Sequence, residues 1–253
     1  MTMKKIFLFS LFISMFCTLA NAQLSVFSDS YGAGATFVDF GGSINAVSID
    51  NTVAHTGTSS IKAIVPSSSY TGGAFKAATN QNLSTYNAIS FWVKASASKT
   101  LNGSGISNNG TAAVYQAEYN NLAVSTTWTK YIIPIPAASK LTAEDGLFHF
   151  AEGSDEGPYT LWFDDIQYEN SSAVGAYSPS IVTQTVTPAV GGTFGVTVQP
   201  LTVLVNGVSQ TIAVNLACYS FMSSNTAIAT IGANGTGAAV SAGTATITAS
   251  LGM

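Results

Sequence analysis

The chain has 253 residues, of which 12 are acidic and 8 are basic, and its formal net charge at pH 7 is −4. It therefore lacks the clustered cations that bind phosphate, which argues against nucleic acid as a partner. Only two cysteines are present, so the chain must fold around hydrophobic cores and not around a disulfide framework.

The first 22 residues have the three parts of a secretory signal peptide. A lysine pair precedes an apolar run at 6–19, which is too short to span a bilayer comfortably, and Ala20-Asn21-Ala22 offers a cleavage site. Cys17 lies inside this run without the small residues of a lipoprotein signal before it, so we expect it to be removed with the peptide. The pattern predicts a protein that is secreted or reaches the cell surface, with no membrane span in the mature chain.

Residues 23–170 alternate strand-like and turn-like segments and show no amphipathic helix pattern. The connections contain Gly-Gly, Asn-Gly, Asn-Asn-Gly and proline, which favour turns between successive antiparallel strands. A segment of this length predicts a two-sheet sandwich of the jelly-roll type. Its clearest strands are expected at 61–65, 88–94, 112–119, 129–135, 147–151 and 160–168.

Three blocks of this segment resemble the calcium-containing, galactose-binding-like jelly rolls that include many bacterial carbohydrate-binding modules. The blocks are V-A-H-T-G-T-S-S-I-K at 53–62, I-S-F-W-V-K at 89–94 together with T-W-T-K-Y-I-I-P at 127–134, and L-W-F-D-D-I at 161–166. The resemblance spans nearly all of residues 24–169 and implies a non-catalytic domain that binds a polysaccharide. It is more specific for the fold than for the ligand, because the group also contains proteins that bind no sugar.

The resemblance also implies a structural calcium ion, a cofactor that takes six to eight oxygen ligands. Matched position by position, its ligands would include Asp29 on the first strand and Asp164 on the last, with Asp165 and Asp50 as further candidates. Adjacent carboxylates on a strand are costly without a cation. The alternative is that the pair at 164–165 only closes a strand at a solvated edge.

Strand alternation predicts which polar and aromatic side chains face away from the core and could bind a sugar. We expect five of them to share one outer face, where such jelly rolls bind glycans: Trp92, Lys94, Gln116, Glu118 and His149. The opposite parity of the strand at 112–119 would put Tyr115 and Tyr119 in the site instead. Tyr31 and Tyr70 lie in glycine-rich segments and could contribute at the rim. Outward Gln, Glu and Lys are also ordinary on a solvated face.

The usual catalytic patterns are absent from this segment. A glycosidase needs two carboxylates across the scissile bond, yet most acids here lie in or beside turn-like segments and no E-x-D-x-x-E run occurs. There is also no G-x-S-x-G elbow and no H-E-x-x-H. These observations favour a binding module over a glycoside hydrolase or lyase. A structural cell-surface or adhesion protein without sugar binding is the alternative.

The composition changes abruptly beyond residue 170. No acidic, basic or histidine residue occurs from 174 to 253, so this part has almost no group for acid–base chemistry. We expect Cys218 to be a buried structural cysteine and Asn206-Gly207 to form a hairpin turn. A polar linker is expected at 171–178, followed by short strands at 196–198, 202–205, 210–214, 228–231 and 244–249.

The run S-S-N-T-A-I-A-T-I at 223–231, followed by V-S-A-G-T-A-T-I-T-A at 240–249, resembles a bacterial Ig-like domain of group 2. The resemblance implies a spacer over 179–253 that is incomplete at its C-terminus, because a further strand usually follows this run in that family. The expected fold class is all-β, a jelly-roll sandwich followed by a smaller Ig-like sandwich. The expected function is polysaccharide binding in the N-terminal part of a secreted polysaccharide-degrading enzyme.

Overall fold

The computed structural model describes residues 23–44, 46–178 and 181–251, so the predicted signal peptide at 1–22 lies outside the described residues. Nearly all regular structure in these ranges is β. The helical elements described are two short 3-10 helices, η1 (Ala138–Lys140) and η2 (Leu216–Cys218), and no described helix is long and apolar enough to cross a membrane. The all-β prediction is confirmed.

One sheet of the jelly roll has seven strands, in the order β10-β7-β12-β1-β2, with β5 pairing both β12 and β4. Strands β7 and β12 pair antiparallel although they are far apart in the chain. The strands are β1 (Leu24–Ser28), β2 (Ser30–Tyr31), β4 (Val47–Asp50), β5 (Ser60–Val65), β7 (Ala88–Ala95), β10 (Thr129–Pro134) and β12 (Tyr159–Glu169).

The facing sheet has eight strands, in the order β13-β15-β16-β9-β8-β11-β6-β3. Five of them belong to the jelly roll: β3 (Thr36–Asp39), β6 (Tyr70–Gln81), β8 (Lys99–Asn108), β9 (Ala113–Val124) and β11 (Glu144–Gly153). The other three come from later in the chain: β13 (Val174–Ser178), β15 (Leu201–Val205) and β16 (Val208–Val214).

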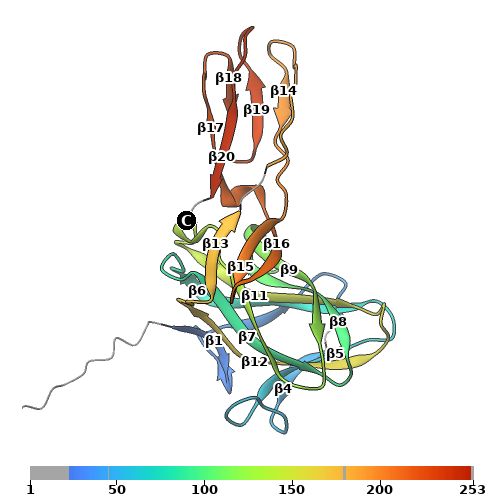
Figure 1. The fold of residues 1–253 in the computed structure, drawn as a ribbon. Coiled ribbons are helices and arrows are strands. Elements are labelled where there is room, and N and C mark those ends of the chain that lie inside the picture. The colour runs from blue at the N-terminus through green and yellow to red at the C-terminus, as the bar shows by residue number, and fades with distance from the viewer. Residues whose placement is uncertain (1–22, 45, 179–180, 252–253) are drawn as a thin grey trace, which may run out of the picture.

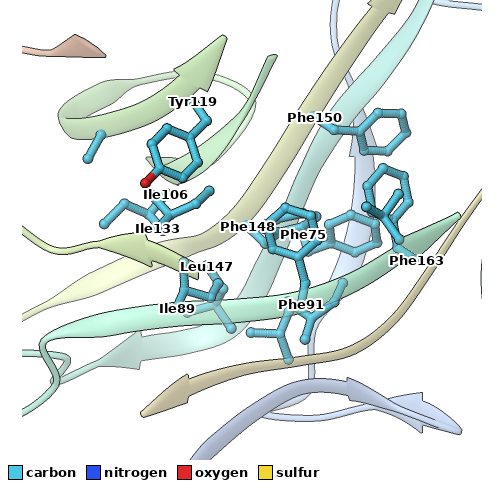
Figure 2. Packing of buried hydrophobic residues seen from close by; sticks show 14 of the residues in the cluster. Phe75, Ile89, Phe91, Ile106, Tyr119, Ile133, Leu147, Phe148, Phe150 and Phe163 are labelled. Atoms are coloured by element: carbon cyan, nitrogen blue, oxygen red, sulfur yellow. The ribbon is translucent and has the colours of Figure 1, made fainter. Parts of the chain in front are cut away.

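Aromatic side chains from both sheets fill the space between them, as Figure 2 shows. Phe91 of β7 lies 5.0 Å from Phe148 of β11, measured between ring centroids, and Phe163 of β12 lies 4.9 Å from Phe150. All four side chains are fully buried. Such pairs contribute about 0.5–1.5 kcal/mol each beyond the burial of their area, so this cluster holds the two sheets face to face.

The six strands expected between residues 61 and 168 are all present, but β6 and β8 were not predicted. Gly72-Gly73 lies inside β6 and Asn102-Gly103 inside β8, although both pairs are typical of turns. Glycine in a strand weakens it and marks a site of close approach. Both strands lie in the interior of the eight-stranded sheet, where their neighbours stabilise what the local sequence does not.

Beyond the jelly roll, the segment expected to be a linker at 171–178 contains strand β13, which pairs with β15. Asn206 and Gly207 form the expected two-residue hairpin, with φ values of 52° and 76°. The prediction of a strand at 196–198 is wrong, because the structure has strand β14 at Thr193–Gly195 and only an isolated bridge at Val198. Cys218 is fully buried, as predicted, and burial raises the pKa of its thiol to about 11.

The remaining strands rise from one end of the jelly roll, with β13, β15 and β16 at the junction (Figure 1). They form a three-stranded sheet, β14-β19-β18, and a two-stranded sheet, β17-β20. Their bounds are β17 (Tyr219–Ser223), β18 (Ala229–Ile231), β19 (Thr236–Ala239) and β20 (Ile247–Leu251). The Ig-like identity of this part stays a prediction.

Candidate functional site

Three polar side chains meet on the outer face of the eight-stranded sheet. Gln116 and Glu118 alternate on β9 with residues that point into the core, so this pair faces outward. His149 stands on β11 between two buried phenylalanines and faces outward as well. Strand β8 lies between β9 and β11, and the three side chains reach each other across it.

Hydrogen bonds link the three side chains. Glu118 Oε2 lies 2.8 Å from His149 Nε2 and accepts a hydrogen bond of 2.9 Å from Gln116 Nε2. The contact with the carboxylate places the imidazole proton on Nε2. The His149 side chain is 2% exposed and the Glu118 side chain 23%, so the carboxylate keeps one side open to solvent.

Small residues on the intervening strands leave room for these side chains. Gly105 of β8 pairs with both Glu118 and His149. A Cβ at this position would lie 2.6 Å from His149 Cε1 and 2.4 Å from the Ala117 carbonyl oxygen, so only glycine fits without a shift. By the same cross-strand registers, further small residues face outward here: Gly72, Ala74, Gly103 and Ala151. Apart from His149, the centre of this face therefore carries no bulky side chain.

Two half-buried aromatic side chains border this face on the side of β3 and β6. The ring centroid of Phe40 lies 6.3 Å from that of His149. The Phe40 N–H donates a hydrogen bond to the Gly72 carbonyl, which continues the pairing of β3 with β6. Tyr70 is two residues before Gly72 on β6, and its hydroxyl donates a 2.6 Å hydrogen bond to the Gly41 carbonyl. We call this surface the polar face and define it by Phe40, Tyr70, Gln116, Glu118 and His149.

The tip of the β8–β9 hairpin covers one end of the sheet beside the polar face. A Cβ at Gly110 would lie 2.9 Å from Val38 Cγ1 of β3, so the tip reaches across the sheet to that strand. Asn109 Nδ2 holds it there through a 2.9 Å hydrogen bond to Asp145 Oδ1. An open hollow of about 250 Å³ lies between the tip and Phe40.

The other tyrosines considered for the site point the opposite way. Tyr119 is 5% exposed in the core, and Tyr115 and Tyr31 pack against the same core. Burial raises the pKa of Tyr119 and of Tyr31. The outward parity of Gln116 and Glu118 is therefore confirmed, and the reversed parity is wrong.

Trp92 and Lys94 lie on the other side of the sandwich. Both face outward from β7, but β7 belongs to the seven-stranded sheet, whereas β9 and β11 belong to the eight-stranded sheet. The expectation that they share one face with Gln116, Glu118 and His149 is therefore wrong. Alternation along a strand decides on which side of its own sheet a residue lies, but not which sheet the strand joins.

Neighbouring side chains already cover Trp92. The His55 ring stacks on it with centroids 3.8 Å apart and lies 5.7 Å from the Trp128 ring. Lys94 Nζ lies 5.9 Å from the ring centroid of Trp128 and 5.5 Å from that of Trp162. The His55 ring thus occupies one face of the Trp92 indole.

Asp29 and Asp164, the main candidates for calcium ligands, both contact the loop before β5. Asp29 Oδ1 accepts hydrogen bonds from the backbone N–H groups of Thr58 and Ser59, which lower the pKa of Asp29. Asp164 is fully buried, and Oδ2 accepts the His55 N–H at 2.7 Å. Burial raises the pKa of Asp164, and this hydrogen bond opposes the increase.

The two further candidates also have protein partners. Asp165 Oδ2 lies 2.7 Å from His55 Nδ1. The hydroxyl of Thr52 and the indole Nε1 of Trp162 donate to Asp50 and lower its pKa to about 2. Within the described ranges, no three acidic, histidine or cysteine side chains gather where one metal ion could be held. The groups around these carboxylates are mainly N–H and O–H donors and not the oxygen ligands of calcium, so calcium stays a prediction.

The sequence did not single out Phe40 or the small residues of β6 and β8. The available signal was the glycine pattern itself, because Gly103 and Gly105 recur at the two-residue period of one strand face. Because Asn-Gly is typical of turns, Asn102-Gly103 was interpreted as a turn and the strand face that it belongs to was not predicted.

A family model described as carbohydrate binding domain 30 matches residues 23–170. Among solved structures, the family 30 carbohydrate-binding module of the cellulosomal cellulase Cel9D-Cel44B of Clostridium thermocellum shares 18% sequence identity with a TM-score of 0.46, covering 60% of this chain and 99% of that one. The family 11 module from Clostridium thermocellum, in complex with a β-1,3-1,4-mixed-linked tetrasaccharide, shares 15% identity with a TM-score of 0.46 over 60% and 98%. No curated protein matches the chain.

Proposed function

Because the chain belongs to the carbohydrate binding domain 30 family through residues 23–170, we propose that its polar face binds a polysaccharide. The observation that carries this proposal is the hydrogen-bonded set of Gln116, Glu118 and His149 beside two half-buried aromatic rings. Carboxylate and amide groups pair with sugar hydroxyls, and an aromatic ring packs on the apolar face of a pyranose.

Glu118 is the group expected to contribute most to binding. Gln116 and His149 both contact its Oε2 atom, so Oε1 is the oxygen that would accept a hydrogen bond from a sugar hydroxyl. Hydrogen bonds to charged groups contribute about 1.5–3 kcal/mol each. The carboxylate is already oriented before the ligand arrives, which reduces the entropy cost of binding.

Affinity electrophoresis tests the proposal. The chain from residue 23 to 253 would be run through gels that carry a β-glucan, xylan, mannan, alginate or pectin. We expect one polysaccharide to retard the wild type and Glu118→Ala to weaken that binding about 10- to 100-fold, the effect of losing about 1.5–3 kcal/mol. Lys94→Ala is the matched control, since it removes a charged side chain from the opposite sheet.

Two outcomes would contradict the proposal. If Lys94→Ala weakens binding and Glu118→Ala does not, the sugar binds at the Trp92 side of the sandwich. If no polysaccharide retards the folded wild type, the structural or adhesion alternative is favoured.

We also propose that the chain is exported by the signal peptide at 1–22 and serves as the accessory part of a polysaccharide-degrading enzyme. The matched family is named for binding and not for catalysis, and the Ig-like segment at 179–253 would act as the spacer. Tethering an enzyme to its substrate raises the local substrate concentration. N-terminal sequencing of the secreted protein checks the export step and should give Gln23 as the first residue.

Calcium binding by Asp29 and Asp164 is proposed on the sequence resemblance alone. A ligand that binds only the folded state raises the melting temperature. Thermal denaturation in calcium and in EDTA therefore tests it: a higher melting temperature in calcium supports the site, and equal melting temperatures contradict it.

A further inference from the structure

The end of β16 pairs with the part of β9 that carries the polar face. Ala213 pairs with Glu118 and Val214 pairs with Ala117. Within the jelly roll, β9 is the last strand of its sheet after β8, and β16 occupies the open edge. An unpaired edge strand is mobile and prone to wrong pairing, so this pairing orders the backbone from which Gln116 and Glu118 project.

Asn215, the residue after β16, attaches to the same strand at two points. Its backbone N–H donates a 3.1 Å hydrogen bond to the Gln116 carbonyl. Its side-chain Nδ2 donates a 2.5 Å hydrogen bond to the Ala113 carbonyl. The backbone contact continues the β16–β9 pairing to Gln116, and the side-chain contact reaches Ala113 at the start of β9.

A buried junction supports this attachment. Leu201, Ile212 and Tyr219 are at most 1% exposed and belong to the same core cluster as the jelly-roll residues. Lys140 of η1 donates hydrogen bonds to the Ala217 carbonyl at 2.7 Å and to the Tyr219 carbonyl at 2.5 Å. The segment is therefore packed on the jelly roll by apolar burial and by charge-assisted hydrogen bonds.

We propose that residues 201–219 complete the binding module, with Asn215 as a positioning residue for Gln116 and Glu118. This inference rests on the proposed function of the polar face. Asn215→Ala keeps the backbone hydrogen bond to Gln116 but removes the side-chain hydrogen bond to the Ala113 carbonyl. The start of β9 then loses its side-chain anchor on the open edge, and its outward side chains lose their fixed register toward His149. The segment beyond residue 170 then supports the strand that carries the ligand site and is not only a spacer.

The test compares Asn215→Ala with Asn225→Ala in the chain from 23 to 253. Asn225 is the matched control, because among the described residues its side chain bonds only to the nearby Ala227 N–H in the distal segment. Hydrogen exchange of the peptide covering residues 113–119 is measured without ligand. Affinity is measured with the soluble polysaccharide that retards the wild type. We expect Asn215→Ala to speed exchange in this peptide and to weaken binding about tenfold, with no change in the control.

A double-mutant cycle separates positioning from a general loss of stability. In the Glu118→Ala background, Asn215→Ala should cause little further loss of affinity, because the positioned group that is expected to contribute most to binding is gone. A full additional tenfold loss would overturn the positioning role, as would unchanged affinity in the single variant. Unchanged exchange at 113–119 would overturn the attachment itself. The exchange result needs no ligand, so it decides the attachment even if no polysaccharide binds and the proposed function fails.

Discussion

Gly105→Ala is the substitution that tests the geometry of the polar face most directly. The added Cβ would lie 2.4 Å from the Ala117 carbonyl oxygen and 2.6 Å from His149 Cε1. The first atom is backbone and cannot turn away, so β8 and β9 must separate locally, and His149 must also shift from its place beside Glu118. Overpacking of this kind costs about 1–3 kcal/mol of unfolding free energy.

Urea denaturation followed by tryptophan fluorescence measures this cost. For an m-value of about 2–3 kcal/mol/M, the loss corresponds to a fall in the midpoint of about 0.3–1.5 M. The same variant should bind polysaccharide more weakly, because the displaced imidazole no longer holds the Glu118 carboxylate.

Gly195→Ala is the control for the loss of glycine itself. No atom lies within 4 Å of a Cβ placed at this position, so stability and binding should stay within error of the wild type. A Gly105→Ala protein with an unchanged midpoint and unchanged affinity would refute the close packing of His149 over β8.

Three further predictions concern ionisable groups. Hydrogen bonds from Thr52 and Trp162 lower the folded-state pKa of Asp50 to about 2, so the ionised carboxylate stabilises the fold above its ordinary pKa of 3.8 and this stabilisation is lost as the pH falls toward 2. Between these pH values the melting temperature of Asp50→Asn should therefore fall less steeply than that of the wild type. Burial raises the pKa of Glu152 above its ordinary 4.5, so its ionisation costs stability as the pH rises from 4.5 through the folded-state pKa. The melting temperature of Glu152→Gln should therefore depend less on pH between 4 and 8, and it should exceed that of the wild type at pH 7. Lys140→Met removes two hydrogen bonds to part-buried carbonyls and should cost about 1–3 kcal/mol of unfolding free energy, with faster proteolysis near residues 171–200. Equal cleavage rates would contradict the role of Lys140 in attaching this segment to the jelly roll.

Local sequence patterns predicted the parts of the fold that depend on neighbours along the chain. The alternation in β9 placed Gln116 and Glu118 outward, and the buried Ala117 and Tyr119 confirm it. Asn206-Gly207 formed its hairpin because both residues tolerate a positive φ. The glycine-containing strands β6 and β8 escaped prediction, because the stability of these strands comes from their partners across the sheet.

By itself the sequence determined the all-β class, the strands with strong alternation, the side of its own sheet on which each residue of those strands lies, and the buried Cys218. These follow from a period of two along the backbone and from the burial of apolar side chains. Only the tertiary structure decided that Trp92 and Glu118 lie on opposite faces and that β16 pairs with β9. Which strands become neighbours depends on contacts between residues far apart in the chain, and no local period encodes those contacts.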